Sequence, residues 1–144
     1  MDAHDAPSRV RALPSWLLGR AAARATRIVA DRTAELGATR TTYAMLAALE
    51  EFGPASQADL GRRLGLDRTD VSSVVGVLDR DGLVRRVTDP ADSRRRRIEI
   101  TPSGLVLLER LGDAIELAQD DLLAALSIRD RAELARILAA LDDR

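Results

Sequence analysis

Apolar residues recur at helical spacing in the first part of this 144-residue chain. An Ala-rich helix is predicted over Pro14–Leu36 with Gly37 at its end, because alanine is the strongest helix former and glycine readily ends a helix. A second helix is predicted over Thr42–Phe52, capped by Thr39 or Thr41. The second helix carries Tyr43, Leu46, Ala47 and Leu49 on one face, which is expected to point inward.

Helical spacing returns at the C-terminal end of the chain. The pair Thr101-Pro102 predicts the start of a long helix that runs to about Ala125, because threonine is a good N-cap and proline suits the first helical position. Ser127 caps a final helix. Residues 1 to about 12 are polar and Ala-rich and are expected to fray. The chain is therefore predicted to be mainly α-helical.

Between these helices, the stretch from Pro54 to Thr101 begins with two short helical patterns. Ser56 is a natural N-cap for the first, and Gly65 ends it. Asp67 caps the second, whose apolar residues fall on one face. These residues are Val71, Val74, Val75 and Leu78. Two short helices joined through a glycine are typical of a helix-turn-helix.

The opposite face of the second short helix carries small or hydroxyl-bearing residues, including Thr69, Ser73 and Gly76. A solvated helix usually fills such positions with long charged side chains, which are better helix formers. A slim hydroxyl-bearing helix fits the major groove of B-DNA, which is about 12 Å wide, and its hydroxyls can bond base edges or phosphates. The alternative is a helix-turn-helix retained only as a packing unit.

After Gly82 the apolar period changes from helical to two. Leu83–Val87 and Ile98–Ile100 alternate apolar with charged residues and are predicted to be short strands. The segment Asp89–Ser93 between them has the composition of a turn. The sequence thus predicts a β-hairpin wing with an arginine-rich turn, and the fold class is mainly α with a winged helix-turn-helix.

Positive charge is concentrated in this wing. Residues 83–97 contain six arginines and two aspartates, a formal charge of +4, so the rest of a chain of net charge −1 carries −5. A local basic cluster is what phosphate binding requires, because neutralising phosphates releases their counterions. Arg94, Arg95 or Arg96 is expected in or along a minor groove, with Asp92 orienting one guanidinium.

These residues resemble the multiple antibiotic resistance regulator (MarR) family of bacterial winged-helix transcription factors. The likeness lies in three strings in family-like order and spacing: S-Q-A-D-L-G-R-R-L-G-L-D-R, L-D-R-D-G-L-V-R-R and D-P-A-D-S-R-R-R-R-I-E-I-T-P-S-G. The family's wing motif of Asp, any residue and Arg corresponds to Asp92, Ser93 and Arg94. Less specifically, the resemblance extends from about Pro14 to the C-terminus.

The residue pattern and the resemblance together predict the DNA contacts. The family often carries a basic residue where this chain has Ser73, and a hydroxyl residue where it has Asp70. The predicted DNA-binding residues are Ser56, Gln57, Arg68, Thr69, Asp70, Ser72, Ser73, Arg80, Asp92, Arg94, Arg95 and Arg96.

The long C-terminal helix carries apolar residues at the seam spacing of a coiled coil, with further leucines off the seam. Such a helix needs partners on several sides, and a second copy of the chain supplies them; an intramolecular bundle is the alternative. The predicted dimerisation residues are Leu13, Leu17, Leu108, Leu111, Ile115, Leu122, Leu134, Ile137, Leu138 and Leu141. We expect one domain, 1–144, with the winged helix-turn-helix at 38–101 and dimerisation helices at 13–37 and 102–144.

A dimer of this kind predicts a sequence-specific regulator that binds a pseudo-palindromic operator with half-sites about 10 bp apart. The resemblance implies that this regulator is a repressor. The resemblance also implies an effector, a small aromatic or phenolic anion that shifts the spacing of the recognition helices. The candidate effector contacts are Trp16, Arg20, Tyr43 and Met45. The alternatives are that Trp16 anchors the dimer core and that Tyr43 is an ordinary core tyrosine.

Composition narrows the remaining classes of function. The chain has no cysteine and one histidine, His4, and no cluster that suggests a metal site, so no metal or other cofactor is expected. No nucleophile–base pair is evident, and the chain is not expected to be an enzyme. It contains neither an apolar run of membrane-spanning length nor a signal-peptide pattern, and a cytoplasmic protein without a membrane partner is expected.

The main alternative function is a protein-interaction module whose arginine wing binds an acidic partner or a membrane surface. It fits the charge of the wing equally well. It fits the Ser/Thr face of the second short helix poorly, because protein interfaces favour aromatic residues and methionine.

Overall fold

The computed structural model describes residues 5–142, and the prediction of fraying for residues 1–4 and the position of His4 lie outside them. The contacts of the chain divide it into two compact units. A central unit comprises Arg32–Ile115, and a terminal unit combines the residues up to Asp31 with those from Glu116 onward. The predicted winged helix-turn-helix region, 38–101, falls within the central unit.

The helices of the central unit begin where the sequence places N-caps. Helix α3 (Arg40–Phe52) is capped by Thr39, which shares reciprocal hydrogen bonds with Thr42, so Thr39 is the cap of the two threonines considered. Helix α4 (Gln57–Leu64) is capped by the Ser56 hydroxyl and ends at Gly65, whose left-handed backbone favours glycine. Helix α5 (Arg68–Arg80) is capped by Asp67.

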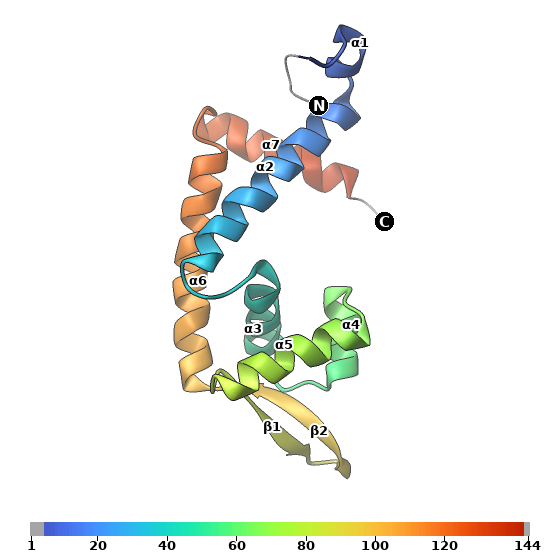
Figure 1. Cartoon of the computed structure of the whole chain (residues 1–144), viewed down its shortest axis with the longest axis vertical. Helices are drawn as coiled ribbons and strands as arrows, with labels where there is room; N and C mark the ends of the chain where they lie inside the picture. The colour runs from blue at the N-terminus through green and yellow to red at the C-terminus, as the bar shows by residue number, and fades with distance from the viewer. Residues whose placement is uncertain (1–4, 143–144) are drawn as a thin grey trace. The chain divides into compact units, whose positions relative to one another are not determined.

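One core joins α3, α4 and α5 to the base of the hairpin (Figure 1). The apolar face predicted for α5 is the buried one: Val71, Val75 and Leu78 are buried, and Val74 packs against them. Glycine at position 61 lets the two short helices approach, because a Cβ there would lie 3.0 Å from the Leu66 carbonyl oxygen. The buried core residues are Met45, Leu46, Ala48, Leu49, Leu60, Val71, Val75, Leu78, Val84, Ile98 and Leu111.

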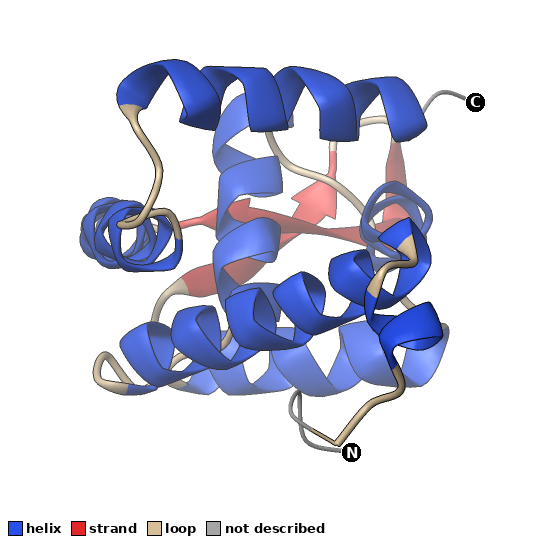
Figure 2. Cartoon of the chain, turned by 90° about the horizontal axis from the view of Figure 1, so that it is seen from above, coloured by secondary structure: helices blue, strands red, loops and turns tan. Residues whose placement is uncertain are grey.

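Strands β1 (Val84–Asp89) and β2 (Asp92–Ile100) form an antiparallel hairpin, drawn in red in Figure 2. Strand β2 is longer than predicted. The arginine run lies in this strand and not in the turn, which is reduced to Pro90 and Ala91. Periodicity could not reveal this, since both faces of the hairpin are exposed here and no apolar side chain marks the alternation.

Helix α6 (Pro102–Leu122) begins directly after β2, with the Thr101 hydroxyl accepting from the Gly104 N–H at 3.1 Å, as the sequence predicts. The terminal unit contains α2 (Pro14–Ala34) up to Asp31 and α7 (Ile128–Leu141), which Ser127 caps. The expectation of fraying up to residue 12 is wrong for α1, since Ser8–Arg11 form one helical turn. Within residues 5–142, no helix combines the length and apolar character needed to span a bilayer.

Candidate nucleic-acid interface

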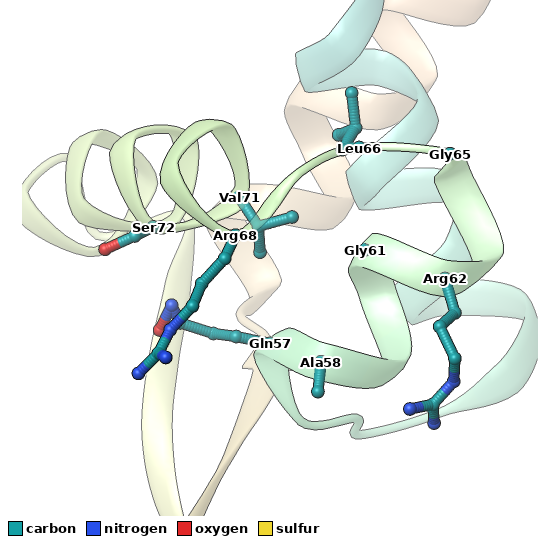
Figure 3. Close-up of a pocket in the computed structure, with 9 residues that line it drawn as sticks. All are labelled: Gln57, Ala58, Gly61, Arg62, Gly65, Leu66, Arg68, Val71 and Ser72. Carbon is teal, nitrogen blue, oxygen red and sulfur yellow. The ribbon is translucent and has the colours of Figure 1, made fainter.

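An open groove of about 720 Å³ runs between α4 and the start of α5 (Figure 3). The two N-termini of the helix-turn-helix contribute Gln57 and Arg68 to its lining, and Ser72 follows one turn into α5. Its lining also includes two small residues of α4, Ala58 and Gly61, which leave room for a backbone or base edge. Helix N-termini present unpaired N–H groups and a partial positive charge, so this groove favours an anion such as phosphate.

Thr69, Ser73 and Arg80 lie on the side of α5 opposite its buried face, and Ser72 lies at the flank. Thr69, Ser72, Ser73 and Arg80 are all exposed. The helix is fixed from behind by the buried Val71, Val75 and Leu78, so its hydroxyl groups are displayed by a rigid support. Asp70 is exposed as well, and the Asp67 carboxylate holds its N–H at 2.8 Å.

Ser56 is the N-cap of α4, as predicted, and its role as a DNA contact stays a prediction. Its hydroxyl accepts from the Asp59 N–H at 3.1 Å and is half-buried. The hydroxyl hydrogen remains available to donate to an outside acceptor, since the cap uses only an oxygen lone pair. Ser56 therefore contributes to the interface mainly as the cap that fixes the start of α4.

The wing tip contains a bulge. Thr88 pairs with Arg96, but the next pair is Asp89 with Asp92, so residues 93–95 have no opposite residue on β1. The Asp92 carboxylate accepts from the Arg94 N–H at 3.0 Å and shapes this bulge. Bulges re-aim side chains at the ends of sheets, and this bulge contains Arg94 and Arg95.

Most arginines of the wing are already paired with carboxylates or hydroxyls. Arg85 makes two hydrogen bonds to Glu99 at 3.2 Å, and this hydrogen bonding, together with the Glu99 charge, raises the pKa of Arg85 above its ordinary value. Looser ion pairs join Arg95 to Asp92 at 3.8 Å and Arg97 to Asp89 at 3.9 Å. Arg96 donates to the Thr88 hydroxyl at 3.3 Å.

Arg94 differs from these arginines. Its side chain is exposed and makes no hydrogen bond or ion pair within residues 5–142. Asp92 therefore holds the backbone of Arg94 and the guanidinium of Arg95, which agrees with an orienting role for this aspartate. Of the wing arginines predicted to contact DNA, Arg94 and Arg96 have no carboxylate partner among residues 5–142, and Arg94 is the one whose side chain also makes no hydrogen bond there.

Arg62 was missed by the sequence patterns. It lies on α4 and lines the same groove as Gln57 and Arg68 (Figure 3). Its guanidinium pairs with Asp59, one turn earlier on the same helix. The signal in the sequence was weak, because Arg62 and Arg63 are adjacent and lie on different faces of α4. Arg63 instead stacks on the Phe52 ring, 3.9 Å from its centroid.

The candidate effector contacts fall in different units. Trp16 and Arg20 belong to the terminal unit, where the Arg20 guanidinium stacks 5.0 Å from the centre of the tryptophan ring. Tyr43 and Met45 belong to the central unit. Tyr43 is half-buried against the core, and Met45 is completely buried in it. An effector role for these four residues stays a prediction.

A helix-turn-helix that displays a hydroxyl-bearing helix beside an arginine-rich hairpin defines the winged helix-turn-helix class. A model of the MarR family matches residues 36–95. The chain is 33% identical over 105 residues to a putative transcriptional regulatory protein for the hcr operon of Thauera aromatica, an alignment that covers 73% of this chain and 63% of that protein.

Two solved structures extend this likeness over nearly the whole chain. A probable transcriptional regulator from Pseudomonas aeruginosa is 34% identical, with a TM-score of 0.78 over 90% of this chain and 97% of that one. The PcaV transcriptional regulator from Streptomyces coelicolor, in complex with its natural ligand, is 30% identical, with a TM-score of 0.75 over 94% and 96% of the two chains. The protein belongs to the MarR family of transcriptional regulators.

The ion pairs of the wing arginines predict which of these arginines contributes most to DNA affinity. Arg94→Ala should weaken binding to every DNA duplex by roughly tenfold, because one charge-assisted hydrogen bond to phosphate is lost. It should also reduce the slope of log affinity against log salt by about one. Arg95→Ala should have a smaller effect, since its guanidinium is partly neutralised by Asp92. Fluorescence anisotropy over a salt series measures both quantities.

Arg129→Ala, an exposed arginine of α7, is the matched control and should leave both quantities unchanged. Equal salt slopes for Arg94→Ala and the unsubstituted protein would show that Arg94 does not reach a phosphate.

Proposed function

We propose that this regulator is a homodimeric repressor that binds a pseudo-palindromic operator. The proposal rests on three features of the central unit: the groove between α4 and α5, the exposed hydroxyl face of α5, and the exposed Arg94 of the wing. One hydrophobic core holds α4, α5 and the base of the wing together. The face supplies hydrogen bonds to base edges, and the groove and wing supply contacts to phosphates. A protein that occupies promoter DNA in this way blocks transcription, and its place of action is the cytoplasm.

The protein-interaction alternative is weaker on the same evidence. The exposed face of α5 offers Thr69, Ser72 and Ser73, which are side chains that contribute little to protein interfaces. An acidic protein partner would use the charge of the wing but would leave this face without a role.

Dimerisation is supported by the surface of the terminal unit. A groove of about 450 Å³ lies among α2, the end of α6 and α7, and apart from Arg24 its lining is apolar. Monomeric proteins rarely expose large contiguous apolar patches, and a second copy of the chain covers such a surface symmetrically. The exposed large apolar residues of this unit are Leu13, Leu17, Leu18, Leu117, Ile128, Ile137, Leu138 and Leu141.

The predicted dimerisation residues do not all fit this role equally. Leu111 is completely buried in the core of its own central unit, so its side chain is not available to a second copy. Leu108 also packs against that core. The seam spacing along the helix could not separate these residues from the rest, because spacing shows which residues share a face but not what covers it.

The dimer is tested with an aspartate at its apolar surface. Leu138→Asp should yield a monomer, because a charge at this position would be buried without a partner in the dimer. Operator affinity should then fall about 100-fold or more, since one of two half-sites is lost. Sedimentation velocity gives the mass, and Val106→Asp, at an exposed apolar residue of the central unit, is the control that should remain dimeric. A dimeric Leu138→Asp protein would place the interface elsewhere.

An anionic effector is supported by an open surface hollow along α2 in the terminal unit. Arg20, Arg24 and Arg27 line a space of about 330 Å³ together with two alanines of the same helix. Arg24 is engaged with the carbonyl oxygens of Leu122 and Asp121, at 3.1 and 3.5 Å. Arg20 and Arg27 have no ion pair among residues 5–142, and Trp16 offers a ring beside Arg20. Two unpaired guanidinium groups beside an aromatic ring suit an aromatic carboxylate. The PcaV transcriptional regulator, which is 30% identical to this chain, was solved in complex with its natural ligand.

The effector site is tested by titration with a panel of hydroxybenzoates. The protein should bind at least one, and Arg20→Ala should weaken that binding by about tenfold or more through loss of a charge-assisted bond. Arg110→Ala, an exposed arginine of α6, should bind as the unsubstituted protein does. Calorimetry measures the affinity, and equal affinities for the two variants would remove Arg20 from the site.

Operator binding itself is tested first by a gel shift on the DNA upstream of the protein's own gene, with unrelated DNA as competitor. Selection from random duplexes then defines the preferred sequence. We expect two inverted half-sites about 10 bp apart, with Ser73→Ala changing the preferred bases more than the total affinity. Failure of selection to enrich any sequence would favour the interaction module instead.

A further inference from the structure

Gly82 and Leu83 connect the last turn of α5 to the first strand of the wing. Both are held to α5 by their own N–H groups: Gly82 donates to the Asp79 carbonyl at 3.1 Å, and Leu83 to the Leu78 carbonyl at 2.9 Å. Gly82 has a φ of 72°, a left-handed conformation that glycine adopts at little cost. This junction thus continues α5 rigidly up to the point where β1 begins.

The two carbonyl groups of the same junction are held by the start of α6. The Thr101 hydroxyl donates to the Gly82 carbonyl at 2.6 Å, and the Thr101 N–H donates to the Leu83 carbonyl at 3.1 Å. The same hydroxyl accepts from the Gly104 N–H at 3.1 Å. Thr101 therefore follows β2 directly, caps α6 with its hydroxyl, and holds the junction with that hydroxyl and its backbone N–H.

Gly104 completes this contact by its lack of a side chain. A Cβ at this position would lie 2.1 Å from the Leu83 carbonyl oxygen and 2.7 Å from Ile100 Cγ1. The nearest of these atoms belongs to the backbone and cannot move aside as the end of a side chain can. The T-P-S-G string that follows the wing is thus the point where α5, both wing strands and α6 meet (Figure 1).

A second interaction spans the same junction. Arg86 of β1 lies 3.6 Å from the Asp79 carboxylate of α5, and both side chains are partly exposed. An ion pair of this exposure contributes little to stability, so the hydrogen bonds of Thr101 are the main restraint.

We propose that Thr101, with Gly104, is a positioning residue that fixes the angle between α5 and the wing. The inference rests on the proposed DNA-binding function. A fixed angle would let α5 occupy a major groove while Arg94 reaches the neighbouring DNA backbone. A preset angle reduces the ordering that DNA binding would otherwise require. Without the clamp, the wing keeps its hairpin but loses its fixed direction.

The angle is measured without DNA by spin-label distances. The chain has no cysteine, so Val77→Cys on α5 and Ser93→Cys at the wing tip introduce two unique labelling sites. Labelled protein is mixed with an excess of unlabelled protein, which leaves only distances within one chain. Thr101→Val should broaden the distance distribution, and Thr101→Ser, which keeps the hydroxyl, should leave it unchanged. Equal widths for Thr101→Val and the unsubstituted protein would overturn the proposal.

Thr101→Asp separates the clamp from the helix cap. A carboxylate still caps α6 but cannot donate to the Gly82 carbonyl, so this variant should fold and should broaden the same distribution. A narrow distribution for Thr101→Asp would show that capping alone sets the wing, which also overturns the proposal.

Operator affinity provides the functional readout. Thr101→Val should bind the selected operator about tenfold more weakly, and Arg94→Ala should then cost far less than it does in the unsubstituted protein, because a misdirected wing makes no contact to lose. Ser73→Ala should have the same effect in both backgrounds. A full cost of Arg94→Ala in the Thr101→Val background would contradict positioning. Failure of the unsubstituted protein to select any DNA contradicts the proposed function, and the spin-label distances still decide the clamp.

Discussion

The interface depends on the burial of one face of α5. Val71, Val75 and Leu78 are removed from solvent by α3, α4 and the base of the hairpin, where Val84 and Ile98 are also buried. A helix held by such a face has only one orientation, because any rotation would expose apolar area and open voids in a close-packed core. The hydroxyl residues of α5 owe their display to this constraint, and the groove beside α4 exists because the same core holds the two helices together.

Electrostatics at the interface is decided by pairing within the wing and not by the net charge of the chain. The wing is strongly basic on an acidic protein, but Arg85, Arg95 and Arg97 each lie beside a carboxylate. These pairs reduce the charge of the wing, whereas Arg94, which lies in the bulge, has no ion pair among residues 5–142.

The elements of the fold were predictable because their signals are local. The caps Ser56, Asp67 and Ser127 lie where predicted, and so does the buried face of α5, since capping and amphipathic spacing act within a few residues. The length of β2 was not predictable, because its first residues are strand only through pairing with β1, and no apolar alternation marks them in the sequence. The candidate DNA contacts were predicted from residue type and order, but Arg62 was not among them, because only the fold brings it to the groove that Arg68 also lines.

The sequence by itself determined the helices, the existence of a basic hairpin and the family to which the chain belongs, because these depend on local chemistry and on motif spacing. Only the tertiary structure decided which arginine of the wing is free, that Leu111 serves the core of its own chain, and that Thr101 and Gly104 clamp the junction between α5 and β1. The physical reason is the same in each case. Ion pairs, burial and close backbone contacts form between residues distant along the chain, and no local pattern records the partner.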